Sequence, residues 1–138
     1  NVVCEMKRTT IDIMISHMYA SGPTPPYLIR VPGYQVDHEM FDMVVHRPVQ
    51  FKDYENGEWK EAYLDETQWI VSERVTGHRV VNSNMSYRSR VLAVNKAKEL
   101  VNKPGSREKI AAKMLQVSAQ RVLSLPIMRF DFSQEKTK

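Results

Sequence analysis

Residues 49–64 read VQFKDYENGEWKEAYL, and this stretch decides how the middle of the chain folds. At its centre lies Asn56-Gly57, the dipeptide typical of a two-residue type I′ hairpin, in which both turn residues must adopt a positive φ. The stretch therefore predicts two antiparallel strands, Val49–Glu55 and Glu58–Leu64, joined by a tight turn.

The register of this hairpin predicts one aromatic pair and two opposite-charge pairs across the strands: Tyr54 with Trp59, Asp53 with Lys60, and Lys52 with Glu61. It also places Glu55 opposite Glu58, a like-charge pair that costs less than the turn chemistry contributes. One face of the hairpin then carries the apolar residues Val49, Phe51, Ala62 and Leu64.

Further strands are expected on both sides of the hairpin. Residues 10–16 alternate polar and apolar side chains, and residues 27–31 form a short β-branched run. Between them, residues 21–26 contain three prolines and predict a stiff, extended connector. Residues 68–75 and 79–83 predict a second hairpin around Thr76-Gly77-His78, whereas residues 38–46 are compatible with either a helical turn or a strand.

After residue 83 the composition changes to Lys, Ala, Leu and Glu at helical spacing. We expect one helix from about Tyr87 to Asn102, with Ser86 as its N-cap, and a second that begins after Ser106, with Ser106 as its cap, and stops at Pro126. Their apolar stripes are Ala93, Val94, Ala97, Leu100 and Val101 for the first, and Ile110, Ala111, Met114, Leu115, Val117, Val122 and Leu125 for the second. Residues 127–132 predict an edge strand.

These elements predict one α+β domain over residues 1–138, an antiparallel β-meander of four to six strands with two C-terminal helices packed on one face. The chain has 138 residues, close to the commonest domain size. We expect residues 1–8 and 133–138 to be flexible.

Composition excludes several classes of protein. Hydrophobic residues make up 42% and charged residues 26%, as in ordinary globular proteins, and the apolar runs are too short to span a bilayer. The chain contains one cysteine, Cys4, so an internal disulfide cannot form and a reducing, intracellular setting (cytoplasmic or organellar) is expected.

No motif indicates an enzyme or a cofactor. Asp37, His38, Glu39 and His46 are all metal-ligand types, but their spacing matches no known ligand pattern, so we predict no metal site. The glycines are scattered singly, without a phosphate-binding pattern, and no serine lies in a glycine-rich elbow. We therefore predict a non-enzymatic binding protein without a cofactor.

The charge distribution carries the strongest functional signal. Residues 1–68 hold 6 Lys/Arg and 11 Asp/Glu, a balance of −5, whereas residues 69–138 hold 14 and 5, a balance of +9. A basic surface attracts phosphate backbones through counterion release. We predict that the basic half engages nucleic acid, or a nucleic-acid-handling assembly as an accessory subunit or a phage- or plasmid-type accessory protein, through Arg88, Arg90, Lys96, Lys103, Arg107, Lys109, Lys113, Gln116, Gln120 and Arg121.

Three alternatives remain open. The acidic and basic halves could neutralise one another within the domain. The acidic hairpin could hold a protein partner, as in a small inhibitor or interaction module, through Asp53, Glu55, Glu58 and Trp59. Residues 106–122 also resemble helix-turn-helix DNA-binding segments, in which Ser118, Ala119, Gln120 and Arg121 would open the recognition helix. Leu115-Gln116 replaces the usual turn glycine of that motif, which favours one continuous helix.

Overall fold

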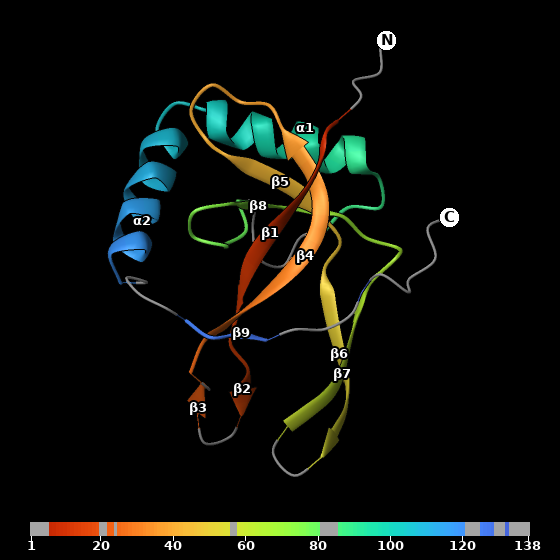
Figure 1. Ribbon diagram of the computed structural model, residues 1–138. Coiled ribbons are helices and arrows are strands. Elements are labelled where there is room, and N and C mark those ends of the chain that lie inside the picture. Colours follow the sequence, from red (N-terminus) through yellow and green to blue (C-terminus); the bar gives the residue numbers. More distant parts are fainter. Residues whose placement is uncertain are drawn as a thin grey trace.

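The computed structural model describes residues 6–19, 22–23, 25–55, 58–80, 86–120, 125–128 and 132. Over this part the chain has the predicted α+β architecture, an antiparallel sheet followed in sequence by two helices (Figure 1). Residues 1–5 and 133–138, for which flexibility was expected, lie outside the described part, whereas residue 8 already belongs to a strand.

Four antiparallel strands form the main sheet, in the order β1 (Arg8–Ile15), β4 (Tyr27–Val36), β5 (Met43–His46) and β8 (Ile70–Glu73). A short strand, β9 (Ile127–Met128), pairs in parallel with the first half of β4 and lies within the edge strand predicted for residues 127–132. The segment 38–46, which the sequence left open, is a loop followed by β5.

Two hairpins extend away from the main sheet (Figure 1). One consists of β2 (Met18–Tyr19) and β3 (Gly22–Pro23) and continues β1 and β4. The other consists of β6 (Val49–Glu55) and β7 (Glu58–Leu64), with the bounds predicted from Asn56-Gly57, and continues β5 and β8. The turn dipeptide itself lies outside the described residues.

The register of β6 and β7 confirms the predicted pairs of Tyr54 with Trp59 and Lys52 with Glu61. The predicted pair of Asp53 with Lys60 is wrong, since the ladder skips this position and Asp53 adopts a φ of 62°. A left-handed residue turns its peptide groups away from the ladder, and aspartate is one of the few residue types that tolerate this conformation.

The main sheet curls until the turn after β8 reaches β1 on the far edge. The backbone N–H of Met14 donates to the carbonyl oxygen of Gly77 at 3.3 Å. Gly77 has a φ of 71°, and a Cβ at this position would lie 2.6 Å from the carbonyl oxygen of Asp12. Only glycine satisfies both demands, so Gly77 lets the sheet close.

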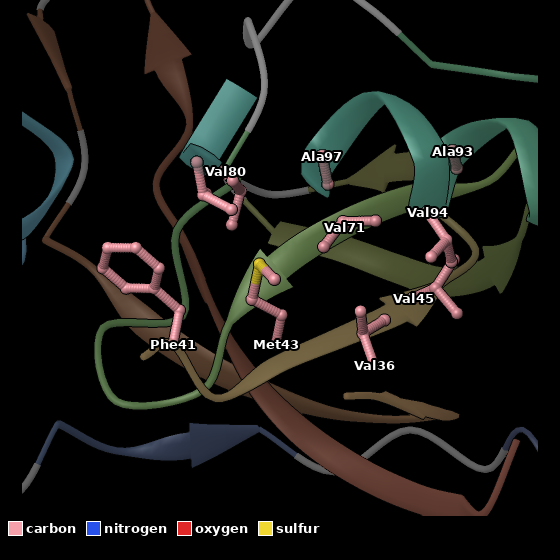
Figure 2. Close-up of a cluster of buried hydrophobic side chains, with 10 residues drawn as sticks. Val36, Phe41, Met43, Val45, Val71, Val80, Ala93, Val94 and Ala97 are labelled. Carbon is pink, nitrogen blue, oxygen red and sulfur yellow. The ribbon is translucent and has the colours of Figure 1, made fainter. Parts of the chain in front are cut away.

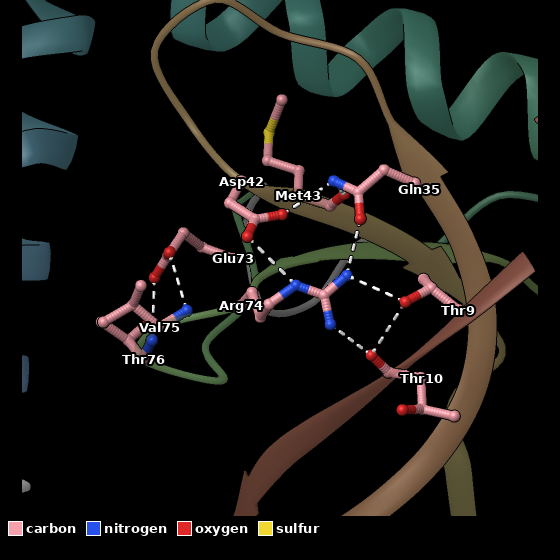
Figure 3. Close-up of polar contacts among 9 residues, drawn as sticks. All are labelled: Thr9, Thr10, Gln35, Asp42, Met43, Glu73, Arg74, Val75 and Thr76. Atoms are coloured by element: carbon pink, nitrogen blue, oxygen red, sulfur yellow. Dashed lines mark hydrogen bonds and ion pairs between the residues drawn. The ribbon is translucent and has the colours of Figure 1, made fainter. Parts of the chain in front are cut away.

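Arg74, directly after β8, also connects this end of β8 to β1, through the hydrogen bonds drawn in Figure 3. Its guanidinium donates to Asp42 Oδ2 at 3.1 Å, to Gln35 Oε1 at 2.6 Å and to Thr9 Oγ1 at 3.1 Å, and also to the carbonyl oxygen of Thr10. Gln35 Nε2 in turn donates to Asp42 Oδ1 at 2.7 Å. The network joins residues from β1, β4 and the segments beside β5 and β8.

Helix α1 (Arg90–Asn102) packs across one face of the sheet (Figure 1). Its buried residues are Ala93, Val94, Ala97 and Val101, as the stripe predicts, and they meet side chains of the sheet and its loops that include Val36, Phe41, Met43, Val45, Val71 and Val80 (Figure 2). The opposite face of the sheet covers a second cluster, which contains Ile11, Ile13, Ile29, Val31, Val44 and Leu64.

The start of α1 differs from the prediction. Ser89, not Ser86, caps the helix, because its hydroxyl oxygen accepts from the N–H of Leu92 at 3.2 Å. Tyr87 pairs as an isolated β-bridge with Trp69, and the hydroxyl of Ser86 donates to Gln68 Oε1 at 2.8 Å. These contacts with the segment before β8 keep residues 86 and 87 extended.

Helix α2 (Ser106–Gln120) packs beside α1 and adds Ile110 and Ala111 to the first core cluster. Ser106 is the first helical residue and not the cap. Instead the side chain of Glu108 accepts from the N–H of Gly105 at 3.0 Å, which is half of a capping box. Leu115, predicted on the apolar stripe, is 75% exposed, because the side chains of α2 that pack against the core, among those the structure describes, are Ile110 and Ala111 on another side of the helix.

Candidate nucleic-acid interface

Two lysines follow one another along the outer face of α2. Lys109 and Lys113 are exposed, and Gln116 continues the same line at the next helical repeat. We call Lys109, Lys113 and Gln116 the lysine row. Lys103 lies exposed in the short connection before α2. Neither Lys103 nor the two lysines of the row forms an ion pair with a residue that the structure describes.

Two other predicted cations are neutralised by carboxylates. Arg107 lies at 2.9 Å from Glu39, which belongs to the loop before β5, and Lys96 lies at 3.7 Å from Glu99 one helical turn away. Together with the ion pair of Arg74 and Asp42, the Arg107 pair joins the basic half of the sequence to the acidic half. Part of the charge asymmetry is therefore cancelled within the fold.

The side chain of Arg90 has a different environment. Its Cζ atom lies 4.2 Å from the centre of the Tyr34 ring and 5.7 Å from that of Trp69, and these two rings are 6.2 Å apart. Arg47 covers Trp69 at 4.1 Å, and Arg8, the cross-strand neighbour of Tyr34, lies 5.9 Å from the tyrosine ring. We call these three arginines with their two rings the arginine cluster.

Sequence reasoning named Arg90 but missed the other four members of this cluster. They come from β1, β4, the end of β5 and the segment before β8, and the sheet order brings them to the N-terminal end of α1. The tendency of arginine to stack on aromatic faces gives no sequence signal when the residues lie far apart in the chain. Arg88, also predicted, is exposed two residues before Arg90.

The remaining predicted residues are placed incompletely. The backbone of Gln120 ends α2, but its side chain and all of Arg121 lie outside the described part, as do the side chains of Glu55 and Glu58. Asp53 is exposed, whereas Trp59 is partly buried.

Trp59 belongs to an aromatic group between the two projecting hairpins. Its ring centre lies 5.0 Å from Tyr54, 6.1 Å from Phe51 and 5.9 Å from His17. His17 Nε2 lies 2.5 Å from the hydroxyl of Tyr27, and burial lowers the pKa of His17. This group packs the β6–β7 hairpin against the β1–β4 side, so Trp59 has a structural role there.

α2 continues without interruption through Leu115-Gln116. A helix-turn-helix would need its turn at this position. The segment thus lacks the geometry on which that alternative depends.

The histidines considered as metal ligands have other partners. The Nδ1 atom of His38 accepts from the N–H groups of Met40 and Phe41, and its Nε2 lies 2.9 Å from Asn102 Oδ1, which fixes the loop before β5 to the end of α1. His46 is fully buried beside Ser72. Among the described residues there is no group of three or more His, Cys, Asp or Glu side chains that could hold a metal ion.

His46 and Ser72 form a serine–histidine pair, with Nε2 and Oγ 2.8 Å apart. Their side chains are 0% and 1% exposed, so a substrate has no access to the hydroxyl. The pair belongs to the interior of the sheet.

Of the helices in the described part, none is long and apolar enough to cross a membrane. Comparison of the chain with protein-family models, curated proteins and solved structures finds no match in any of the three.

Proposed function

We propose that this protein is a non-enzymatic binding protein whose helical surface engages the phosphate backbone of nucleic acid, as an accessory component of an assembly that handles it. The observation that carries the proposal is the lysine row with Lys103. These three lysines are exposed and have no carboxylate partner among the described residues, unlike Lys96 and Arg107.

The local charge balance supports this proposal. Residues 88–120 contain eight Lys/Arg and two Asp/Glu, a balance of +6. Of the two carboxylates, Glu99 pairs with Lys96 and Glu108 accepts from the N–H of Gly105. Positive charge on α2 is thus left for an external anion, and each phosphate that it neutralises would release counterions.

The chemistry of the row favours contacts with phosphate over contacts with bases. Gln116 is the only residue of the row with both a donor and an acceptor, and the described residues of α2 include no aromatic side chain on which a base could stack. Binding should therefore depend weakly on sequence and strongly on salt.

The test is the binding of an arbitrary duplex at several salt concentrations, with Lys109→Gln/Lys113→Gln as the variant. Two phosphate contacts fewer should reduce the slope of log affinity against log salt by about 2. The matched control is Lys52→Gln/Lys60→Gln, which changes the net charge equally but lies on the β6–β7 hairpin. Equal effects of both variants, or no detectable binding at low salt, would refute the proposal.

A second candidate function is a protein-interaction module that uses the acidic hairpin. Residues 49–66 contain six Asp/Glu and two Lys, and Tyr54 and Tyr63 are each 47% exposed on the projecting hairpin (Figure 1). Exposed tyrosines are common anchors in protein interfaces. Charge reversal at Asp53, Glu55 and Glu58 should then abolish capture of a basic protein partner and leave nucleic-acid retention unchanged.

A further inference from the structure

We infer that the arginine cluster is a second phosphate-binding site, which holds the phosphodiester backbone of the same nucleic acid. This inference rests on the proposed function and adds a contact point to it. The site consists of Arg8, Arg47 and Arg90, held over the rings of Tyr34 and Trp69.

The first argument is the concentration of like charge. Arg47 and Arg90 both approach the Trp69 ring, at 4.1 and 5.7 Å, which puts their charges within about one Debye length, roughly 10 Å, of each other. Arg8 approaches the Tyr34 ring that Arg90 also covers. Such a group repels itself unless an anion is near.

No carboxylate lies within ion-pair distance of these arginines in the described part of the chain, and the first turn of α1, where Arg90 lies, has no acidic residue. Hydrogen bonds from Thr67 lower the pKa of Asp65, and Arg47 is close enough that its charge contributes to this lowering. By contrast, Arg30, Arg74 and Arg107 each have an aspartate or glutamate partner. The fold thus brings three arginines together and gives none of them a direct carboxylate partner among the described residues.

The second argument is the orientation of the donors. A guanidinium that lies over an aromatic ring uses its flat face for the ring and leaves its N–H edge for an acceptor. Arg47 donates to the carbonyl oxygens of Glu66 and Gln68, which holds it in place. Arg8 and Arg90 make no side-chain hydrogen bond to another described residue, so their guanidinium N–H groups can donate to a bound anion.

Phosphate is the anion that this arrangement suits best. Its tetrahedral oxygens accept two parallel N–H bonds from one guanidinium, and several arginines can share one phosphate or two adjacent ones. The rings of Tyr34 and Trp69 are partly buried, and a guanidinium group already lies over each of them, which leaves less aromatic surface on which a base could stack. The site should hold backbone without selecting a sequence.

The location distinguishes this site from the lysine row. Arg90 begins α1, whereas the lysine row follows the other end of that helix, and 13 helical residues span about 20 Å. Two contact points this far apart on one duplex would bind more tightly than either point alone.

Trp69 itself reports on the site. In a Trp59→Phe background it is the single tryptophan of the chain, and its emission should change when phosphate approaches Arg47 and Arg90. Titration with an arbitrary 20-base-pair duplex at low salt should give an emission change with the same midpoint as duplex binding measured by retention.

The variants are Arg90→Gln and Arg8→Gln, each of which should reduce the salt slope by about 1 and weaken binding. Arg30→Gln is the control, because this substitution removes the same charge from an exposed arginine that already has a carboxylate partner, Asp12. Circular dichroism and thermal unfolding establish that each variant is folded. Arg8 is the more exposed position and keeps the test valid if Arg90→Gln unfolds.

The outcomes separate the two claims. The arginine site would be overturned if duplex binding left Trp69 emission unchanged and if Arg8→Gln and Arg90→Gln had the same duplex affinity and salt slope as Arg30→Gln. The proposed function would then remain intact. Absence of duplex binding by the unaltered protein would overturn both.

Discussion

The Nε2 atom of His46 lies 2.8 Å from the hydroxyl oxygen of Ser72, on the neighbouring strand, and both side chains are buried. On the other side of the ring, Nδ1 lies 3.0 Å from the carbonyl oxygen of Arg47, which can only accept. Nδ1 therefore carries the proton, and Nε2 accepts from Ser72. Burial lowers the pKa of His46 from 6.5 to about 4, and the charge of Arg79 acts in the same direction.

The free energy of unfolding should consequently decrease as the pH falls from about 6.5 to about 4. The unfolded chain takes up a proton at this histidine near pH 6.5, whereas the folded protein resists it until about pH 4. Above pH 6.5 the ring is neutral in both states and the free energy of unfolding is not reduced. Between pH 6.5 and pH 4 the free energy of unfolding falls by up to about 3 kcal/mol. Urea unfolding at four pH values measures the loss, and a ring that titrates near 6.5 by NMR in the folded protein would contradict it.

Gly77→Ala should destabilise the protein strongly. An alanine there adopts an unfavourable left-handed conformation, and its Cβ meets the backbone of Asp12. Gly105→Ala is the matched control, since Gly105 also has a positive φ, 87°, but open space around it. We expect a loss of about 1 kcal/mol for Gly105→Ala and at least about 2 kcal/mol more for Gly77→Ala, by chemical unfolding. Equal losses would show that the closure against β1 does not depend on this contact.

Arg74→Met should cost about 2 kcal/mol or more, because it leaves Asp42, Gln35 and Thr9 without their shared donor. Arg30→Met removes an exposed ion pair with Asp12 and should cost less than about 1 kcal/mol. A double-mutant cycle of Arg74→Met with Asp42→Ala measures their coupling. A coupling near zero would mean that the network of Figure 3 contributes little to stability.

Leu115→Ala should change stability by less than about 0.5 kcal/mol, because this side chain is largely exposed. Val101→Ala, in the completely buried part of the α1 stripe, should cost about 2 kcal/mol or more. Thermal unfolding of both variants tests which side of α2 faces the core. A large loss for Leu115→Ala would restore the stripe predicted from the sequence.

Local signals in the sequence were reliable where one short segment decides the structure. Asn56-Gly57 fixed the bounds of β6 and β7 and the pairing of Tyr54 with Trp59, because turn geometry and cross-strand contacts act within a few residues. The same local reasoning chose the wrong cap for α1. Ser86 and Ser89 both satisfy the capping rule, and the bridge between Tyr87 and Trp69 decides between them.

The candidate site shows the same limit. The lysine row was predictable, since Lys109, Lys113 and Gln116 share a helical stripe within one segment. The contact of Arg107 with Glu39 and the gathering of Arg8 and Arg47 around Arg90 depend on the order of the strands. Composition could not show which cations the fold would neutralise.

The closure of the sheet also bears on how the chain folds. The hydrogen bond from Met14 to Gly77 joins residues more than sixty positions apart, and β9 pairs with β4 across an even longer stretch of sequence. Ordering such loops costs entropy before the contacts that they bring together can form. The strands β6 and β7 are neighbours in sequence, so their pairing can form early in folding. The contacts of β1 with Gly77 and of β4 with β9 can form only after long loops have closed. We expect this loop closure to limit the folding rate.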